Sequence, residues 1–318
     1  MIIRVNTTKN YEIKIGNGII TNLPEGFIIT DKNVYNFYGN LIRGNSFILK
    51  PGEKSKNLIT YREIVEKLSE SGEERIIAFG GGVIGDIAGF VASTYKRGIE
   101  LIQVPTTLLA MVDSSIGGKN GINISNKKNY IGTIYQPNGV LIDPSFLETL
   151  PEHEFKNGLA EVIKYFAVFN KPNIKKLENI SKFNDIEKII TECCQMKVNV
   201  VERDEFDKGY RHILNFGHTI GHAIELLYGL SHGEAISIGM IKELKAGIKL
   251  GIINRTKLDE IENLLISNKL PTELPYNSNL EKIISLIKSD KKGKFIFSFN
   301  EKNYNVLLDE KIIREVLT

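Results

Sequence analysis

Short apolar runs alternate with longer stretches of helical periodicity in the first half of the chain. The runs span residues 27–30, 46–49, 75–79, 100–104 and 140–142. The spacers between them, such as residues 54–71, have the length and the three- and four-residue spacing of apolar positions that predict helices. This alternation predicts βαβ units around a parallel sheet, in which ligands bind beyond the carboxyl ends of the strands.

The second half of the chain has an almost entirely helical pattern. Residues 144–154 are typical of a linker that leads into a helix, and residues 294–299 and 304–308 predict a hairpin near the end. The length of 318 residues allows two domains. We therefore expect a Rossmann-like α/β domain over residues 1–147 and a mostly α-helical domain over residues 148–318.

The most concentrated candidate chemistry lies in residues 211–232, RHILNFGHTIGHAIELLYGLSH. If residues 211–227 form one helix, five polar side chains fall within an arc of roughly 80°: Arg211, Asn215, His218, His222 and Glu225. A third histidine, His232, follows just after that helix. Ordinary solvated faces are rich in Lys, Glu and Gln. Two histidines one turn apart, in a chain with only five, therefore favour a metal site over a structural polar face. The zinc-protease motif HExxH is excluded because Thr219 follows His218.

A glycine-rich turn follows the third apolar run and precedes a helical pattern. Gly80, Gly82 and Gly85 satisfy G-x-G-x-x-G, which lets a backbone and a helix N-terminus approach a nucleotide phosphate. The usual dinucleotide fingerprint instead follows the first strand and has an acidic residue about 20 residues later. In this chain the acidic candidates for a ribose, Asp31 and Glu53, come earlier. A glycine turn required only by packing is the alternative.

Several cations and amides suggest an anion pocket. Pro105, Thr106 and Thr107 predict a helix start. Beyond it come a polar glycine-rich turn and a second cation with an amide: Asp113, Gly117, Gly118, Lys119, Lys128 and Asn129. Lys197 lies in an apolar stripe, so its ammonium either reaches solvent or is partly buried and functional. Glu161 and Lys164 lie one turn apart, and a surface ion pair is the alternative to a functional role for them.

Composition excludes little but favours a small-molecule partner. The chain is 42% hydrophobic and 25% charged, with a net charge of +3 and no basic block, so we expect neither nucleic-acid nor membrane binding. No apolar run approaches the roughly 20 residues that span a bilayer, and the first residues lack the apolar region of a signal peptide. The only two cysteines, Cys193 and Cys194, are adjacent, which fits a reducing, cytoplasmic compartment.

Six segments of the chain resemble the 3-dehydroquinate synthase family of the shikimate pathway, which belongs to the sugar-phosphate cyclases. They read GGGVIGDIAGFVASTYKRG, QVPTTLLAMVDSSIGGKNGIN, KKNYIGTIYQP, GLAEVIKY, LNFGHTIGHAIE and SHGEAISIGM, and they occur in the family's order. The resemblance implies an NAD-binding α/β domain, a helical metal- and substrate-binding domain, and an active site in the cleft between them. It also implies a homodimer, in which Arg97 reaches across the interface.

The resemblance also implies a role for individual residues. Zn²⁺ or Co²⁺ is expected on Glu161, His218 and His232, with His222 facing the substrate phosphate and not the metal. NAD is expected at Asp31, Glu53, Lys56, Gly81, Gly82, Val83, Asp86, Thr106, Thr107, Lys128 and Thr149. The sugar acid phosphate is expected at Asp113, Lys119, Asn129, Lys164, Lys197, Arg211, Asn215 and His222. The family usually has more residues after the lysines at 291 and 292, which leaves open whether either contacts the phosphate.

The implied reaction converts 3-deoxy-D-arabino-heptulosonate 7-phosphate to 3-dehydroquinate and phosphate. It runs through transient oxidation at C5 by NAD, β-elimination of phosphate, re-reduction, ring opening and an intramolecular aldol step. Cyclases that form other rings act on substrates without a carboxylate, and Arg211 and Lys197 favour an acid substrate. A polyol or alcohol dehydrogenase of the same superfamily would release NADH. The third alternative, an inactive binding protein, is disfavoured because all three expected metal ligands are present.

Overall fold

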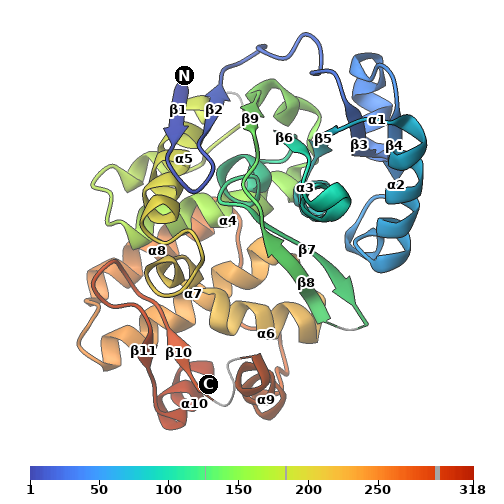
Figure 1. The fold of residues 1–318 in the computed structure, drawn as a ribbon. Coiled ribbons are helices and arrows are strands. Elements are labelled where there is room, and N and C mark those ends of the chain that lie inside the picture. Colours follow the sequence, from blue (N-terminus) through green and yellow to red (C-terminus); the bar gives the residue numbers. More distant parts are fainter. Residues whose placement is uncertain (126, 183–184, 291–293) are drawn as a thin grey trace. The chain divides into compact units, whose positions relative to one another are not determined.

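A computed structural model describes residues 1–125, 127–182, 185–290 and 294–318 (Figure 1). The chain forms two compact units, one from residues 1–155 and 185–206 and the other from residues 156–184 and 207–318. These two units are defined by how the chain packs. The expected functional boundary after residue 147 stays a prediction. No helix among the described residues combines the length and the apolarity needed to cross a bilayer.

A seven-stranded sheet forms the centre of the first unit, in the order β1-β2-β9-β6-β5-β3-β4. The strands are β1 (Ile2–Val5), β2 (Tyr11–Ile15), β3 (Phe27–Asp31), β4 (Ser46–Leu49), β5 (Arg75–Gly80), β6 (Glu100–Pro105) and β9 (Gly139–Ile142). All neighbours pair in parallel except β1 with β2. The five predicted apolar runs are therefore confirmed as strands. β3 and β5 are nearly continuous buried runs, as expected for parallel strands covered on both faces.

Four helices accompany this sheet: α1 (Lys32–Tyr38), α2 (Leu58–Ser71), α3 (Gly82–Thr94) and α5 (Ile186–Arg203). Ile84, Ile87 and Val91 of α3 share one hydrophobic core with Phe27 and Ile76 of the strands. The predicted helix over residues 54–71 begins later than expected, at Leu58. The reason is the side chain of Asn57, which accepts hydrogen bonds from the N–H groups of Ile59 and Thr60 and so caps the helix.

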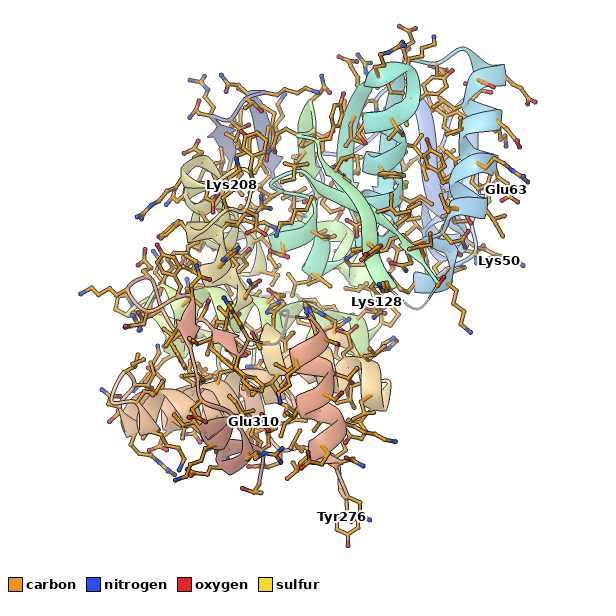
Figure 2. All side chains as sticks on the ribbon, turned by 60° about the horizontal axis from the view of Figure 1, so that its bottom comes forward. Lys50, Glu63, Lys128, Lys208, Tyr276 and Glu310 are labelled. Atoms are coloured by element: carbon orange, nitrogen blue, oxygen red, sulfur yellow. The ribbon has the colours of Figure 1, made fainter. Side chains whose placement is uncertain are left out.

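Two features of the first unit were not predicted from the pattern. β1 and β2 form an antiparallel pair at the edge of the sheet. An antiparallel hairpin of β7 (Lys119–Ile124) and β8 (Lys127–Ile134) occupies the segment expected to be a polar turn, and Figure 2 shows Lys128 near its tip. The predicted helix start after Pro105 is confirmed, because Thr107 Oγ1 accepts a hydrogen bond from Ala110 N.

The second unit is mostly helical, as predicted. Its helices are most of α4 (Glu152–Val168), and α6 (His218–Tyr228), α7 (His232–Lys249), α8 (Arg255–Ser267), α9 (Leu280–Asp290) and α10 (Glu310–Leu317). The hairpin near the end is confirmed as β10 (Ile296–Phe297) with β11 (Val306–Leu307). Ile220 and Ile224 of α6 pack with Ile238 of α7 and Ile283 of α9 in one core.

The prediction of one continuous helix over residues 211–227 is wrong. A 3₁₀ helix, η7 (Tyr210–Asn215), ends before Phe216, and α6 starts at His218. Gly217 between them has φ of 81°, a left-handed conformation that breaks the helix. Its N–H donates to the buried carboxylate of Glu243 at 2.8 Å. A Cβ on Gly217 would lie 2.9 Å from the carbonyl oxygen of Ile236, so α7 requires glycine at this turn.

Candidate functional site

Three metal-ligating side chains converge in the second unit. Glu161 projects from α4, His218 is the first residue of α6 and His232 is the first residue of α7. One ligand atom from each lies within 4.8 Å of the others. Glu161 Oε1 lies 3.4 Å from His218 Nε2 and 3.3 Å from His232 Nε2. Two imidazoles and one carboxylate are the donor set of a three-ligand catalytic zinc site, so these residues fit Zn²⁺ or Co²⁺.

Hydrogen bonds orient both histidines toward Glu161. His218 Nδ1 lies 3.0 Å from the carbonyl oxygen of Phe216, and His232 Nδ1 lies 3.2 Å from Glu225 Oε2. Carbonyl and carboxylate oxygens only accept hydrogen bonds, so each Nδ1 carries a proton. With Nδ1 protonated, Nε2 is the nitrogen that would bind a metal ion on each ring.

Burial and neighbouring charges set the protonation of the two histidines differently. Burial, followed by the ammonium of Lys164, holds the pKa of His218 well below its usual value, so this imidazole is neutral at neutral pH. Burial also lowers the pKa of His232, but hydrogen bonds to Glu161 and Glu225 outweigh it and raise that pKa to about 9. A cation bound beside His232 Nε2 would take the place of the second proton.

Four further expected site residues lie in the second unit. Lys164 forms an ion pair with Glu161 Oε2, and both side chains are buried, so the alternative of a surface ion pair is wrong. His222 is exposed on α6, with its ring centroid 5.1 Å from that of His218. Arg211 is buried in η7 and Asn215 ends it. Because of the break at Gly217, these last two side chains do not share a helix with the histidines.

Lys197 and Asp113 meet in the first unit. The Lys197 ammonium is buried and donates to the backbone oxygen of Asp113 at 2.5 Å and to its Oδ1 at 2.8 Å. The lysine therefore does not extend to solvent, and the expectation of a buried cation is the correct alternative. Asp113 lies in a π-helical turn, η4 (Ala110–Ser114), and is not part of a loose glycine turn. The wider backbone of such turns often accompanies functional sites.

A second network in the first unit joins three expected cofactor residues. The buried Lys56 ammonium lies 2.9 Å from Asp86 Oδ2 and 3.0 Å from Glu53 Oε1. Burial raises the pKa of the Asp86 carboxyl, although Lys56 opposes the shift. Asn123, which sequence reasoning missed, donates to Glu53 Oε1 at 2.8 Å and accepts from the N–H of the expected substrate residue Asn129 at 2.8 Å. A lone asparagine in a strand gives no sequence signal for such a role.

The glycine-rich turn leads directly into the first turn of α3. Gly81 is the N-cap of that helix, and Gly82 and Val83 follow it, so backbone N–H groups and a positive dipole end are available to an anion. Packing also requires glycines in this motif, because a Cβ on Gly80 would lie 2.6 Å from Ile84 and one on Gly85 would lie 2.9 Å from Gln103. The packing interpretation is thus supported at Gly80 and Gly85, whereas phosphate binding by this motif stays a prediction.

The remaining expected residues are spread over the first unit. Asp31 Oδ1 caps α1 by accepting from the N–H groups of Asn33 and Val34. Thr149 Oγ1 lies 2.8 Å from the hydroxyl of Tyr38. Thr106 is buried after β6, and Lys119 and Lys128 are exposed on the hairpin. Arg97 is exposed at the end of the 3₁₀ helix η3 (Tyr95–Arg97) that follows α3, and it has φ of 68°. The lysines at 291 and 292 lie outside the described residues.

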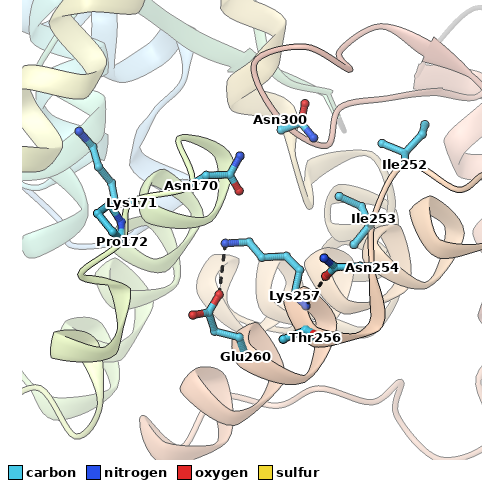
Figure 3. Close-up of a pocket in the computed structure, with 10 residues that line it drawn as sticks. All are labelled: Asn170, Lys171, Pro172, Ile252, Ile253, Asn254, Thr256, Lys257, Glu260 and Asn300. Carbon is cyan, nitrogen blue, oxygen red and sulfur yellow. Dashed lines mark hydrogen bonds and ion pairs between the residues drawn. The ribbon is translucent and has the colours of Figure 1, made fainter.

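Figure 3 shows a pocket in the second unit that contains none of these residues. It is lined by Asn170, Lys171, Pro172, Ile252, Ile253, Asn254, Thr256, Lys257, Glu260 and Asn300. Lys257 Nζ already lies 3.4 Å from Glu260 Oε2 in this pocket. The candidate chemistry is therefore concentrated elsewhere, in the Glu161–His218–His232 group and in the lysine networks of the first unit.

Comparisons with known proteins give a consistent result. Family models match as "3-dehydroquinate synthase N-terminal" over residues 46–157 and "3-dehydroquinate synthase C-terminal" over residues 158–293. The 3-dehydroquinate synthase of Clostridium botulinum (strain Alaska E43 / Type E3) is 44% identical, covering 90% of this chain and 89% of the relative. That of Rippkaea orientalis (strain PCC 8801 / RF-1) is 39% identical, covering 96% of this chain and 88% of the relative.

A similar fold occurs in solved structures of 2-deoxy-scyllo-inosose synthase and 2-epi-5-epi-valiolone synthase. A 2-deoxy-scyllo-inosose synthase complexed with carbaglucose-6-phosphate, NAD⁺ and Co²⁺ matches with a TM-score of 0.88 and 26% identity, covering 100% of this chain and 99% of that one. A 2-epi-5-epi-valiolone synthase from Streptomyces hygroscopicus subsp. jinggangensis 5008, with NAD⁺ and Zn²⁺ bound, has a TM-score of 0.83 at 23% identity, covering 96% of this chain and 95% of that one. The second likeness concerns the fold alone.

Proposed function

Because the chain belongs to the 3-dehydroquinate synthase family, we propose that it converts 3-deoxy-D-arabino-heptulosonate 7-phosphate to 3-dehydroquinate and phosphate. The observation that carries the proposal is the group of buried Glu161 with the partly buried His218 and His232, which supplies the metal donors that such an enzyme needs. The net reaction is redox-neutral, so any hydride removed from the substrate returns to it.

We propose NAD and a divalent metal ion as the cofactors, as in the inosose synthase complex. When bound, NAD accepts and returns one hydride and the metal ion polarises a substrate hydroxyl. The proposed NAD residues include the first turn of α3 for the pyrophosphate and the carboxylates of Asp31 and Glu53 for ribose hydroxyls. Lys56 supports the proposed NAD site because its ion pairs with Glu53 and Asp86 hold these two carboxylates in place.

The residues that surround the Glu161–His218–His232 group favour the binding of an anionic substrate. Lys164 balances part of the charge of Glu161, which reduces the cost of burying that carboxylate. His222 is exposed one turn beyond His218, so it can donate to a substrate oxygen without sharing the Glu161 group. We propose that His222, Arg211 and Asn215 bind the substrate, with His222 on the phosphate.

Lys197 is proposed as a substrate cation of the first unit, with Lys119 and Asn129 on the β7–β8 hairpin. The substrate carries a phosphate and a carboxylate, so cations from several elements are needed to bind it. Asp113 holds the Lys197 ammonium in one position, which lowers the entropic cost of binding an anion there.

Replacing Lys197 by Met should lower kcat/KM by roughly 10- to 100-fold, the size of one hydrogen bond to a charged group. Steady-state kinetics with the heptulosonate phosphate measure the change. Lys188→Met is the matched control, because Lys188 lies on the same helix but is exposed. Equal rates for the two variants would remove Lys197 from the substrate site.

The proposed assembly is a homodimer that places Arg97 on the partner's substrate. Support comes from the backbone, since Lys96 and Arg97 both have positive φ, at 48° and 68°. Two successive non-glycine residues in this conformation are costly, and such strain concentrates at functional positions. Lys96 pairs with Glu74 at 2.7 Å, which anchors the turn and leaves Arg97 exposed at its end.

Arg97→Ala should therefore impair turnover, and mixing it with His218→Ala should restore part of the activity. In a mixed dimer, one active site receives an intact Arg97 from one subunit and an intact metal group from the other. The measurement is the rate of phosphate release after the two inactive variants are unfolded and refolded together. No recovery in dimers shown to be mixed, or full activity of Arg97→Ala alone, would contradict the shared site.

Zinc is proposed as the metal because two imidazoles and one carboxylate form its usual catalytic donor set. A cytoplasmic location is proposed because both cysteines, Cys193 and Cys194, are buried thiols. Burial raises the pKa of the Cys194 thiol to about 12, so it is unreactive at neutral pH.

The substrate assignment is tested by comparing the heptulosonate phosphate with a hexose 6-phosphate, which lacks the carboxylate. With zinc and NAD⁺ present, phosphate should be released from the heptulosonate phosphate and the carbocyclic product should be 3-dehydroquinate. Turnover of the hexose phosphate in preference to the acid would instead place the chain's activity with the other sugar-phosphate cyclases.

A further inference from the structure

Glu225 is not among the expected ligands or substrate residues, yet its side chain contacts one of them. Its Oε2 lies 3.2 Å from Nδ1 of His232, the nitrogen that points away from Glu161. His232 Nε2 lies 3.3 Å from Glu161 Oε1 on the other side of the ring. The imidazole of His232 is thus held between two carboxylates, one on each ring nitrogen.

These contacts separate the roles of the two nitrogens. An ionised carboxylate only accepts hydrogen bonds, so the nitrogen beside Glu225 donates its proton. The other nitrogen, Nε2, is then the one that would bind a metal ion in place of a second proton. His218 reaches the same state by a different route, because its Nδ1 donates to the backbone oxygen of Phe216. Substitution of a side chain cannot remove this backbone partner of His218, whereas it can remove Glu225, the partner of His232.

We propose that Glu225 is a positioning residue that fixes the tautomer and orientation of His232 and so sets the affinity of the metal site. This inference rests on the proposed metal at Glu161, His218 and His232. A carboxylate that accepts the second N–H of a metal-bound histidine also makes the ligand nitrogen more basic. Loss of such a partner typically lowers metal affinity or activity by about 10- to 100-fold.

The position of Glu225 on α6 makes it suitable for substitution. Its side chain is mostly buried, at 14% exposure, whereas its backbone oxygen accepts the C-capping N–H of Gly229. Substitution of the side chain leaves that backbone bond in place, so the end of the helix is preserved. Leu226, the next residue, is exposed and provides a control on the same helix.

The same geometry allows a competing interpretation, in which Glu225 is itself a ligand. His222, Glu225 and His232 also place ligand atoms within 4.8 Å of one another. A cation there would need the lone pair of His232 Nδ1, so it could not coexist with a proton on that nitrogen. The two interpretations therefore predict different numbers of metal ions per chain.

The test measures zinc affinity of the metal-stripped full-length chain by competition with a chromogenic chelator. Glu225→Leu should weaken binding by about 10- to 100-fold, whereas Glu225→Gln should lose only a few fold, because its amide oxygen still accepts from Nδ1. Leu226→Gln should bind zinc like the unsubstituted chain. The visible spectrum of the Co²⁺ form should change in Glu225→Leu and return toward the original in Glu225→Gln.

Each outcome decides between the proposals. One zinc per chain, with affinity falling in the order unsubstituted, Gln, Leu, supports the positioning role. Two zinc ions per chain, with one lost in Glu225→Leu, would overturn it in favour of a second site. Equal affinity of Glu225→Leu and the Leu226 control would also overturn it. An unsubstituted chain that binds no zinc would instead refute the metal assignment of the proposed function.

Discussion

His218→Ala should abolish zinc binding and reduce phosphate release by roughly 1,000-fold, because polarisation by a metal ion contributes several kcal/mol to a transition state. His218 Nε2 lies 3.4 Å from Glu161 Oε1, and His218 supplies one of the two imidazoles of the Glu161–His218–His232 group. Metal content after dialysis, measured by elemental analysis, and the rate of phosphate release should fall together.

His153→Ala is the matched control for this experiment. His153 is exposed near the start of α4 (Glu152–Val168), about two turns before Glu161, and its Nε2 lies 3.7 Å from Glu154 Oε1. The control should retain zinc and full activity. Retention of one zinc per chain by His218→Ala, with activity lost, would show that His218 acts on the substrate and is not a metal ligand.

His222→Ala should keep its zinc and lose turnover by roughly 100-fold, the upper range for one hydrogen bond to a charged group. His222 lies one turn beyond His218 and is exposed, whereas the expected ligands are at least partly buried. In this proposal, α6 (His218–Tyr228) contributes His218 to the metal site and His222 to the substrate phosphate. Zinc content and kcat, measured on the same preparation, separate the two roles.

The result for His222→Ala is informative in both directions. Loss of zinc in parallel with activity would make His222 a ligand and would require a different assignment of the metal group. Unchanged kcat and KM would remove His222 from the substrate site. Circular dichroism of the variant checks that α6 (His218–Tyr228) still forms, since substitution by alanine favours a helix.

The sheet was predictable because its signals are local. Each central strand is a short apolar run bounded by polar or glycine residues, and burial on both faces makes the run nearly continuous. β1 (Ile2–Val5) was missed because its alternating pattern is only four residues long. It is stabilised by pairing with β2 (Tyr11–Ile15), which in turn pairs with β9 (Gly139–Ile142), a strand that is distant in sequence.

The break at Gly217 was not predictable from the pattern, because its cause is a tertiary contact. Periodicity continues through this glycine, and glycine alone is tolerated within helices at a modest cost. The carboxylate of Glu243, which is 26 residues further along, binds the Gly217 N–H, and the backbone of α7 leaves no room for a Cβ. The histidine spacing survived the error since His218 and His222 are both on α6.

The candidate site was predictable in its parts but not in its contacts. Two histidines and a carboxylate indicated a metal, but neither Glu161 as the third donor nor the burial of Lys164 follows from spacing. The resemblance to a family supplied Glu161. Asn123 and Glu225 contact site residues from positions that no motif marks. These contacts depend on which residues lie close together in three dimensions, and a single sequence without the fold does not give that information.

The central claim is that the chain uses NAD as a catalyst in a redox-neutral elimination and cyclisation. The most direct test incubates the purified chain with Zn²⁺, a small amount of NAD⁺ and the heptulosonate phosphate, and follows phosphate release and absorbance of reduced nicotinamide together. The account predicts release of many phosphates per NAD⁺ with no net NADH. Accumulation of NADH in proportion to substrate consumed would contradict it and would make the enzyme a dehydrogenase.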